Sequence, residues 1–206
     1  MTPTFTIRPA RVEELADVER MVLTSFPHLF QPLFGPLPVA QQIEIMMTLR
    51  RTRVDPTAGL FVAVDEGEQV VGTMAFEHAA LHTEVTPERL RAVMSLGLRA
   101  AIRFAFVSNF VLIKERPAAD EFIIRSGAVL PAWRRHGVAA RLIQRIEEEA
   151  VGEGLREYVG WVALTNPASQ ALMLSNGYAI GRHKRYLLRG WIANEPAMIR
   201  FYKAVP

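Results

Sequence analysis

The chain contains no cysteine among its 206 residues, and this absence narrows the chemistry open to it. It excludes a disulfide framework, a thiolate-bound metal and a cysteine nucleophile. The five histidines are scattered and show no metal-ligand spacing: His28, His78, His82, His136 and His183. We therefore expect no metal site.

A large excess of charge of one sign is absent as well. The 24 lysines and arginines nearly balance the 21 acidic residues, and the formal net charge is +3. That excess is too small and scattered to argue for nucleic-acid binding by itself. The first residues, MTPTFTIRPA, lack the regions of a signal peptide, so we expect a cytoplasmic protein. Half of the residues are hydrophobic, and we expect residues 1–206 to form a single domain.

Two familiar phosphate-binding loops are also missing. A Walker loop needs Gly-Lys followed by Ser or Thr, and a dinucleotide fingerprint needs three glycines. The stretch 122–149, FIIRSGAVLPAWRRHGVAARLIQRIEEE, contains neither pattern. It contains instead an apolar strand candidate ended by Pro131, a basic loop, and a helix that opens at Gly137. Apolar residues follow at helical spacing: Val138, Ala139, Leu142, Ile143, Ile146 and Ala150.

This order of strand, basic loop and helix predicts an anion site. A helix N-terminus presents unpaired N–H groups and a partial positive charge. Gly137 and Ala139 would let an anion approach the backbone, and Arg134, Arg135 and His136 add donors. The alternative is an ordinary turn whose basic side chains are solvated.

The same residues carry a family resemblance. Val129-x-Pro131-x-x-Arg134-Arg135-x-Gly137-x-Ala139 resembles the acyl-CoA-binding motif of the GNAT superfamily of N-acetyltransferases. A second block resembles the family's Asn-x-x-Ala-x-x-Leu-Tyr-x-x-x-Gly-Phe pattern: Asn166-Pro-Ala-Ser169, Leu172-Met173 and Gly177-Tyr178. Two spaced motifs in the family's order are a stronger signal than either motif alone.

The resemblance implies acetyl-CoA as the co-substrate and direct transfer of its acetyl group to a primary amine of an unidentified acceptor, a small molecule or a peptide. In that fold the fourth and fifth strands splay, and the pantetheine arm inserts between them. Gly127 would permit a bulge beside the arm, or else it reflects close packing. The resemblance gives these cofactor-binding residues: Ala128, Val129, Arg134, Arg135, His136, Gly137, Val138, Ala139 and Asn166.

The catalytic residues depart from the family pattern. Met173 occupies the position of the tyrosine general acid, and methionine cannot donate a proton. Ile123 occupies the position of the histone-type glutamate base. Glu121, on the same strand face, and Glu77, at the end of the third strand, are the candidate bases. Solvated strand ends or a water chain are the alternatives. Nearby hydroxyls belong to Ser169, Ser175 and Tyr178.

The order of elements predicts an α/β protein with a mixed, twisted sheet of about seven strands flanked by helices, the GNAT fold. Residues 27–38 hold four prolines and are expected to form a loop, pinned to the core or walling the acceptor pocket.

Residues 80–118 form a helical insert between the third and fourth strands. The apolar run 90–113 has membrane-span length, but its arginines exclude a span. Arg91, Ser95, Arg99 and Arg103 would form one stripe on a single helix. The insert would pack on the domain or on a second subunit of a homodimer, cover the acceptor, or bind an anionic membrane surface.

Three classes of function are therefore weighed. The favoured one is an active acyl-CoA-dependent N-acetyltransferase. Loss of the usual acid and base residues motivates a non-catalytic domain that binds or senses acyl-CoA. The small excess of basic residues and the arginine stripe motivate a membrane- or nucleic-acid-binding module.

Overall fold

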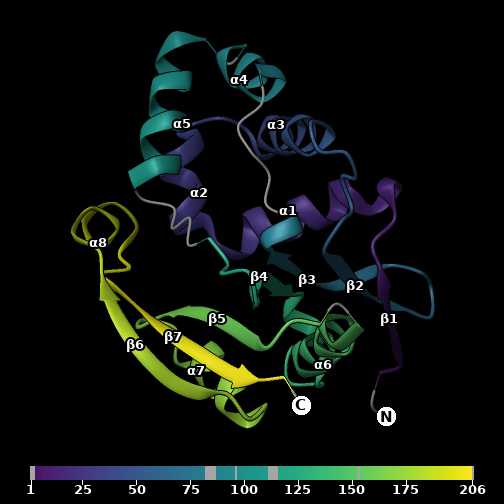
Figure 1. Cartoon of the computed structure of the whole chain (residues 1–206). Coiled ribbons are helices and arrows are strands. Elements are labelled where there is room, and N and C mark those ends of the chain that lie inside the picture. The colour runs from purple at the N-terminus through teal and green to yellow at the C-terminus, as the bar shows by residue number, and fades with distance from the viewer. Residues whose placement is uncertain (1–2, 82–86, 96, 111–115, 153, 206) are drawn as a thin grey trace.

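The computed structural model describes residues 3–81, 87–95, 97–110, 116–152 and 154–205 (Figure 1). In this part, seven strands form one sheet: β1 (Phe5–Pro9), β2 (Leu60–Asp65), β3 (Val70–His78), β4 (Glu121–Val129), β5 (Glu157–Ala163), β6 (Ala179–Arg185) and β7 (Ala197–Ala204). The α-helices of the same residues are α1 (Leu15–Ser25), α2 (Pro27–Phe34), α3 (Val39–Arg51), α4 (Pro87–Met94), α5 (Leu98–Phe110), α6 (Val138–Gly152), α7 (Pro167–Ser175) and α8 (Leu187–Ala193).

The sheet has the order β1-β2-β3-β4-β5-β7-β6 and is mixed. Neighbouring strands are antiparallel except β4 and β5, which run parallel. The ladder between β4 and β5 starts at Glu121 and Glu157 and ends at Ile124 and Gly160. The predicted mixed α/β sheet is confirmed, and its two halves separate at the parallel pair.

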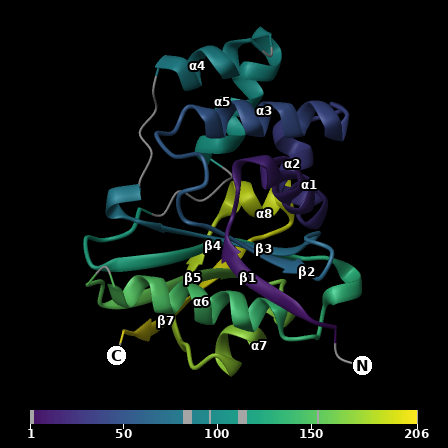
Figure 2. The same ribbon diagram turned by 90° about the vertical axis from the view of Figure 1, so that its right-hand side faces the viewer.

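Helices cover both faces of the sheet (Figure 2). The helix α6 was predicted from its apolar spacing, and its Leu142, Ile143 and Ile146 are buried against Phe122 and Phe201 of the strands. On the opposite face α1 packs Leu15, Val18 and Val22 onto β2. A third apolar cluster joins α1 to α2, α3, α5 and α8: Leu23, Leu33, Phe34, Ile43, Val107 and Ala193.

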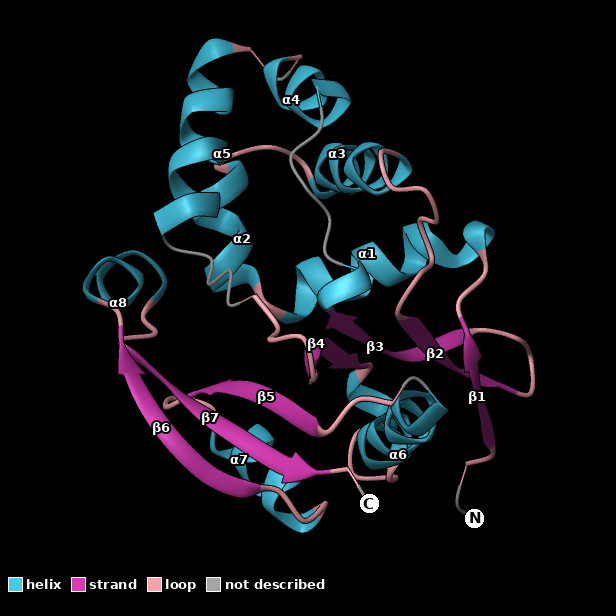
Figure 3. Ribbon diagram, in the orientation of Figure 1, coloured by secondary structure: helices cyan, strands magenta, loops and turns pink. Residues whose placement is uncertain are grey.

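The expectation of a loop at 27–38 is wrong, because residues 27–34 form the helix α2 (Figure 3). Pro27 lies in the first turn, where its missing N–H costs nothing. Pro32 lies inside the helix, which ends two residues later. Leu33 and Phe34 are buried in the third cluster, so packing outweighs the poor helix propensity of the segment.

The expectation of one helix with one arginine stripe in the insert is also wrong. The described residues of the insert, which lies between β3 and β4, form the helices α4 and α5, and Gly97 between them has a φ of +84°. Arg99 is exposed. Arg103 instead donates a hydrogen bond from Nε to the Leu33 carbonyl at 3.1 Å and a second one to the Phe34 carbonyl. Among the described residues, no helix is long and apolar enough to cross a membrane.

Candidate active site

The end of β4 carries the bulge expected from the sequence. Its register against β3 shifts between Thr73 and Ala75, at the point where Ser126 adopts a left-handed backbone with φ of 45°. Gly127 does not supply the left-handed residue. A Cβ on Gly127 would lie 2.8 Å from the Met74 methyl group, so the second expectation, close packing, describes this glycine.

Beyond Ile124 and Gly160, β4 and β5 no longer pair, and the interval between their unpaired ends is called the slot here. Leu130 N–H donates to the Val71 carbonyl of β3 at 2.9 Å. Because backbone groups alternate along a strand, the N–H and carbonyl of Val129 are directed to the other side, into the slot. At the closed end of the slot, Met173 is buried against Gly160, the last residue of β5 that pairs with β4.

The loop after β4 leads into the N-terminus of α6 with its backbone open to solvent. Gly137 has a φ of +80°, and a Cβ built on it would meet nothing within 4 Å. The first helical hydrogen bond runs from Arg141 N–H to the Gly137 carbonyl, so the amides of Val138, Ala139 and Ala140 precede it. This is the geometry of an anion cradle, and a CoA pyrophosphate fits it.

The side chains expected to hold the cofactor are not equivalent. Arg135 and His136 are exposed at the loop. Arg134 is also exposed, but its Nε donates to the Val129 carbonyl at 3.2 Å and ties the loop to the slot. The side chains of Ala128 and Val138 are buried in the core, so these two residues offer a ligand only their backbone.

Asn166 follows β5 and caps α7. Its Oδ1 accepts a hydrogen bond from Ser169 N–H at 3.0 Å. Pro167 occupies the first turn. The cap uses the oxygen of the amide and leaves its NH₂ group to donate to a ligand, so capping and ligand binding are compatible here.

Both candidate bases are engaged in ion pairs. Glu121 accepts from Arg200 at 2.7 Å and from Ala118 N–H at 3.0 Å, and Glu77 accepts from Arg125 Nε at 2.9 Å. Burial lowers the pKa of Arg200, but its hydrogen bonds to Glu157 and Glu121 outweigh burial and raise that pKa overall. To take a proton from an amine, either glutamate would have to give up an ion pair. Their role stays a prediction.

The hydroxyl of Tyr178 is buried. Tyr178 is buried in the cluster that packs against α6. Burial, together with the nearby Glu147 carboxylate, raises the pKa of Tyr178 far above its ordinary value. Lys203, which pairs with Glu147 at 2.7 Å, lies over the tyrosine ring. Tyr178 therefore belongs to the packing of this face, and a role as acid at the slot receives no support from its position.

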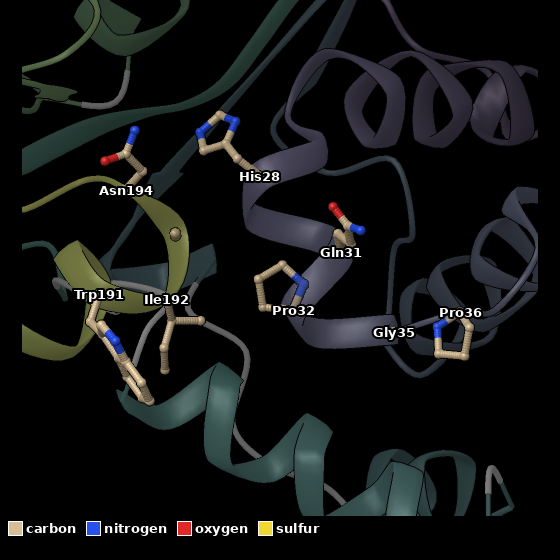
Figure 4. A pocket seen from close by; sticks show the side chains of 9 residues that line it. His28, Gln31, Pro32, Gly35, Pro36, Trp191, Ile192 and Asn194 are labelled. Carbon is tan, nitrogen blue, oxygen red and sulfur yellow. The ribbon is translucent and has the colours of Figure 1, made fainter.

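A cavity of about 640 Å³ lies between α2 and α8 (Figure 4). His28, Gln31 and Pro32 line it from α2, and Trp191 and Ile192 from α8. Sequence reasoning raised the segment 27–38 as a pocket wall but did not find the α8 side. A smaller hollow of about 320 Å³ lies over the strands and is lined by Glu121, Arg182 and Arg200.

Comparisons with known proteins agree with this architecture. A protein described as an acetyltransferase is 18% identical, with a TM-score of 0.72 over 98% of this chain and 100% of the other. An N-acetyltransferase from Staphylococcus aureus Mu50 is 18% identical, with a TM-score of 0.66 over 96% of this chain and 100% of the other. The NatB acetyltransferase complex bound to CoA and MES is 17% identical, with a TM-score of 0.53 over 98% and 99%.

These identities are low, so the solved structures show a shared fold. No curated protein sequence matches the chain significantly. The model of the acetyltransferase (GNAT) family matches residues 17–178, which is most of the chain. The protein is therefore a member of the GNAT family and an acetyl-CoA-dependent N-acetyltransferase.

Proposed function

We propose that acetyl-CoA binds with its pyrophosphate over residues 134–139 and its pantetheine arm in the slot between β4 and β5. The observation that carries this proposal is the open backbone at Gly137, beside three amides that precede the first helical hydrogen bond. Arg135 and His136 add donors at the rim. Val129, directed into the slot, would pair with the arm as an added strand does.

Transfer would then occur beside Val129. A deprotonated amine attacks the thioester carbonyl, and the Val129 N–H is positioned to donate to the oxyanion that forms. The C–S bond breaks and the thiolate leaves. Met173 cannot donate a proton, so departure of the thiolate has to proceed without the family's usual tyrosine. The amine acceptor would enter from the cavity between α2 and α8.

The cofactor site is tested with a matched pair of variants, Gly137→Glu and Gly137→Gln. Both carry the strain of a left-handed side chain, about 1–2 kcal/mol, but only Glu places a carboxylate where phosphate is expected. Calorimetry should find CoA affinity at least ~10-fold weaker for Gly137→Glu than for Gly137→Gln, a difference of about 1.4 kcal/mol. Equal affinities in the two folded variants would refute the placement.

A release assay separates transfer from sensing. The wild-type protein is incubated with acetyl-CoA and a panel of amines, peptides and aminoglycosides, and free thiol is measured. Amine-dependent thiol release supports the enzyme. Tight CoA binding without release for any acceptor would favour the acyl-CoA-sensing alternative. A homodimer, one of the alternatives for the insert, stays a prediction, which analytical ultracentrifugation of the same sample tests.

A further inference from the structure

A buried ion pair at the end of α8 is hydrogen-bonded to a histidine that lines the cavity. The side chains of Arg189 and Glu195 are almost fully buried. Arg189 Nε donates to Glu195 Oε2 at 2.8 Å, and the other carboxylate oxygen lies 2.8 Å from His28 Nε2. The contact joins residues 167 positions apart in the chain. A buried pair of charges is costly to build, and this one fixes the orientation of a single imidazole.

The hydrogen bond determines which nitrogen of His28 can act. A carboxylate only accepts, so Nε2 carries the proton and a neutral ring has its lone pair on Nδ1. Arg189 already balances the charge of Glu195, so the group does not require an imidazolium. The His28 side chain is 43% exposed and lines the cavity, and no described residue bonds to Nδ1.

The imidazole also lies between elements that pack on the two sides of the slot. The Phe26 ring, 6.5 Å from His28, packs against the cluster that contains Ala128 of β4. Glu195 lies just before β7, whose Ala197 carbonyl accepts from Leu164 N–H at the end of β5. The bond between His28 and Glu195 therefore connects the β4 side to the β5 side. It does so on the face away from α6, where α2 and α8 lie (Figure 1).

We infer that His28 is the general base that deprotonates the acceptor amine, with Glu195 and Arg189 as positioning residues. The inference rests on the proposed acetyl transfer. One proton of the ammonium passes to Nδ1 and then to water in the cavity. The amine nitrogen forms the C–N bond, and the C–S electron pair leaves on sulfur. A second proton of that nitrogen ends on the thiolate, so the products are the amide, CoA thiol and one released proton.

The cavity wall also indicates the class of acceptor. Among its described lining residues none is Lys, Arg, Asp or Glu. Trp191 is 85% exposed and offers a ring face, Ile192 and Pro32 are apolar, and Gln31 and Asn194 supply amides. A wall of this kind suits a primary amine carried on an uncharged, apolar or aromatic body.

Few charged groups face His28. Apart from His28, α2 contains no titratable residue. Glu195 bonds to the ring directly, and Arg189 stands behind it. A general base acts only while it is unprotonated, so the wild-type rate should fall as the pH is lowered.

The test compares His28→Gln with His183→Gln, the same change at an exposed histidine of β6. Rates are measured by thiol release with an arylalkylamine from pH 6 to 9.5, and CoA binding by calorimetry. His28→Gln should lower kcat/KM about 10²- to 10⁴-fold and abolish the acidic limb, with CoA affinity within twofold of wild type. His183→Gln should behave as wild type.

The positioning role of Arg189 and Glu195 is tested by a separate variant. Arg189→Gln together with Glu195→Gln keeps a neutral, hydrogen-bonded pair but removes the carboxylate beside the imidazole. The acidic limb should move to lower pH and kcat should fall about tenfold. If His28→Gln retains activity and the wild-type pH profile, His28 is not the base. If the wild type binds CoA but releases no thiol with any amine, the proposed transfer fails, and the inference fails with it.

Discussion

At the scale of single residues, the family motifs pointed to the proposed cofactor side of the site but not to the proposed acceptor side. The motif residues are close in sequence, so spacing alone placed residues 134–139 at one helix end. The contact between His28 and Glu195 spans 167 positions and exists only after α2 and α8 have packed together. No local pattern could have revealed it. For the same reason, the sequence offered Glu121 and Glu77 as bases without showing their arginine partners.

Asn166 allows capping and ligand binding to be separated by substitution. Asn166→Asp keeps the oxygen that accepts from Ser169 N–H but loses the NH₂ donor, whereas Asn166→Ala loses both. The alanine variant should be about 1 kcal/mol less stable, a fall in Tm of about 2–4 °C, and the aspartate variant close to wild type. Thermal melts measure this difference.

If the amide donor reaches the pantetheine arm, both variants should bind CoA more weakly, by about 3- to 10-fold for a lost hydrogen bond. Calorimetry on the two folded variants provides the comparison. If Asn166→Asp binds CoA with wild-type affinity, Asn166 caps α7 and does not bind the cofactor.

At the scale of elements, a helix could be predicted correctly where its apolar spacing and the residues at its ends gave the same signal. The helix α6 has buried residues at three- to four-residue spacing and was predicted correctly. Pro32 disfavours a helix at α2, but the burial of Leu33 and Phe34 outweighs this low propensity. The helix α8 was not predicted, and only the cavity and the third apolar cluster provide a reason for it.

The junction of β1 with α1 gives a pH-dependent prediction. Glu14 accepts two hydrogen bonds from Arg8, at 2.6 and 2.9 Å, and one from Arg11 N–H at 2.7 Å. Burial raises the pKa of Glu14, but these hydrogen bonds outweigh it and lower the pKa overall. Because the folded pKa is depressed, the stabilisation is present above the unfolded value of 4.5 and is lost as pH falls through the folded value.

Glu14→Gln should therefore lower the free energy of unfolding by about 1–3 kcal/mol at pH 7, since hydrogen bonds to a charged group are lost. The difference from wild type should shrink steadily below about pH 4 as the wild-type carboxylate becomes protonated. Urea denaturation at pH 7, 5 and 3.5 measures it. A difference that stays constant over this range would show that the charge of Glu14 contributes nothing.

At the scale of the whole molecule, the sequence predicted the order of the strands and helices around the slot because that order follows the chain. It did not predict how the insert docks, because docking depends on contacts between distant segments. Arg103 of α5 reaches the last carbonyls of α2, and a Cβ on Gly35 would overlap its guanidinium. Gly35 also lines the cavity between α2 and α8. The insert is thus tied to the wall of the proposed acceptor site.

Substitution of the two α5 arginines separately tests this connection. Arg103→Glu removes two donors from the C-terminus of α2 and places a carboxylate against its carbonyls, where the helix dipole is negative. We expect a loss of about 2 kcal/mol, a fall in Tm of about 4–8 °C, and a higher KM for the amine with unchanged CoA affinity. Arg99→Glu, on the exposed side of the same helix, should change stability by less than about 0.5 kcal/mol and leave KM unaltered. Melting curves and thiol-release kinetics on the pair decide the matter: if the two variants behave alike, the insert does not shape the acceptor site through Arg103.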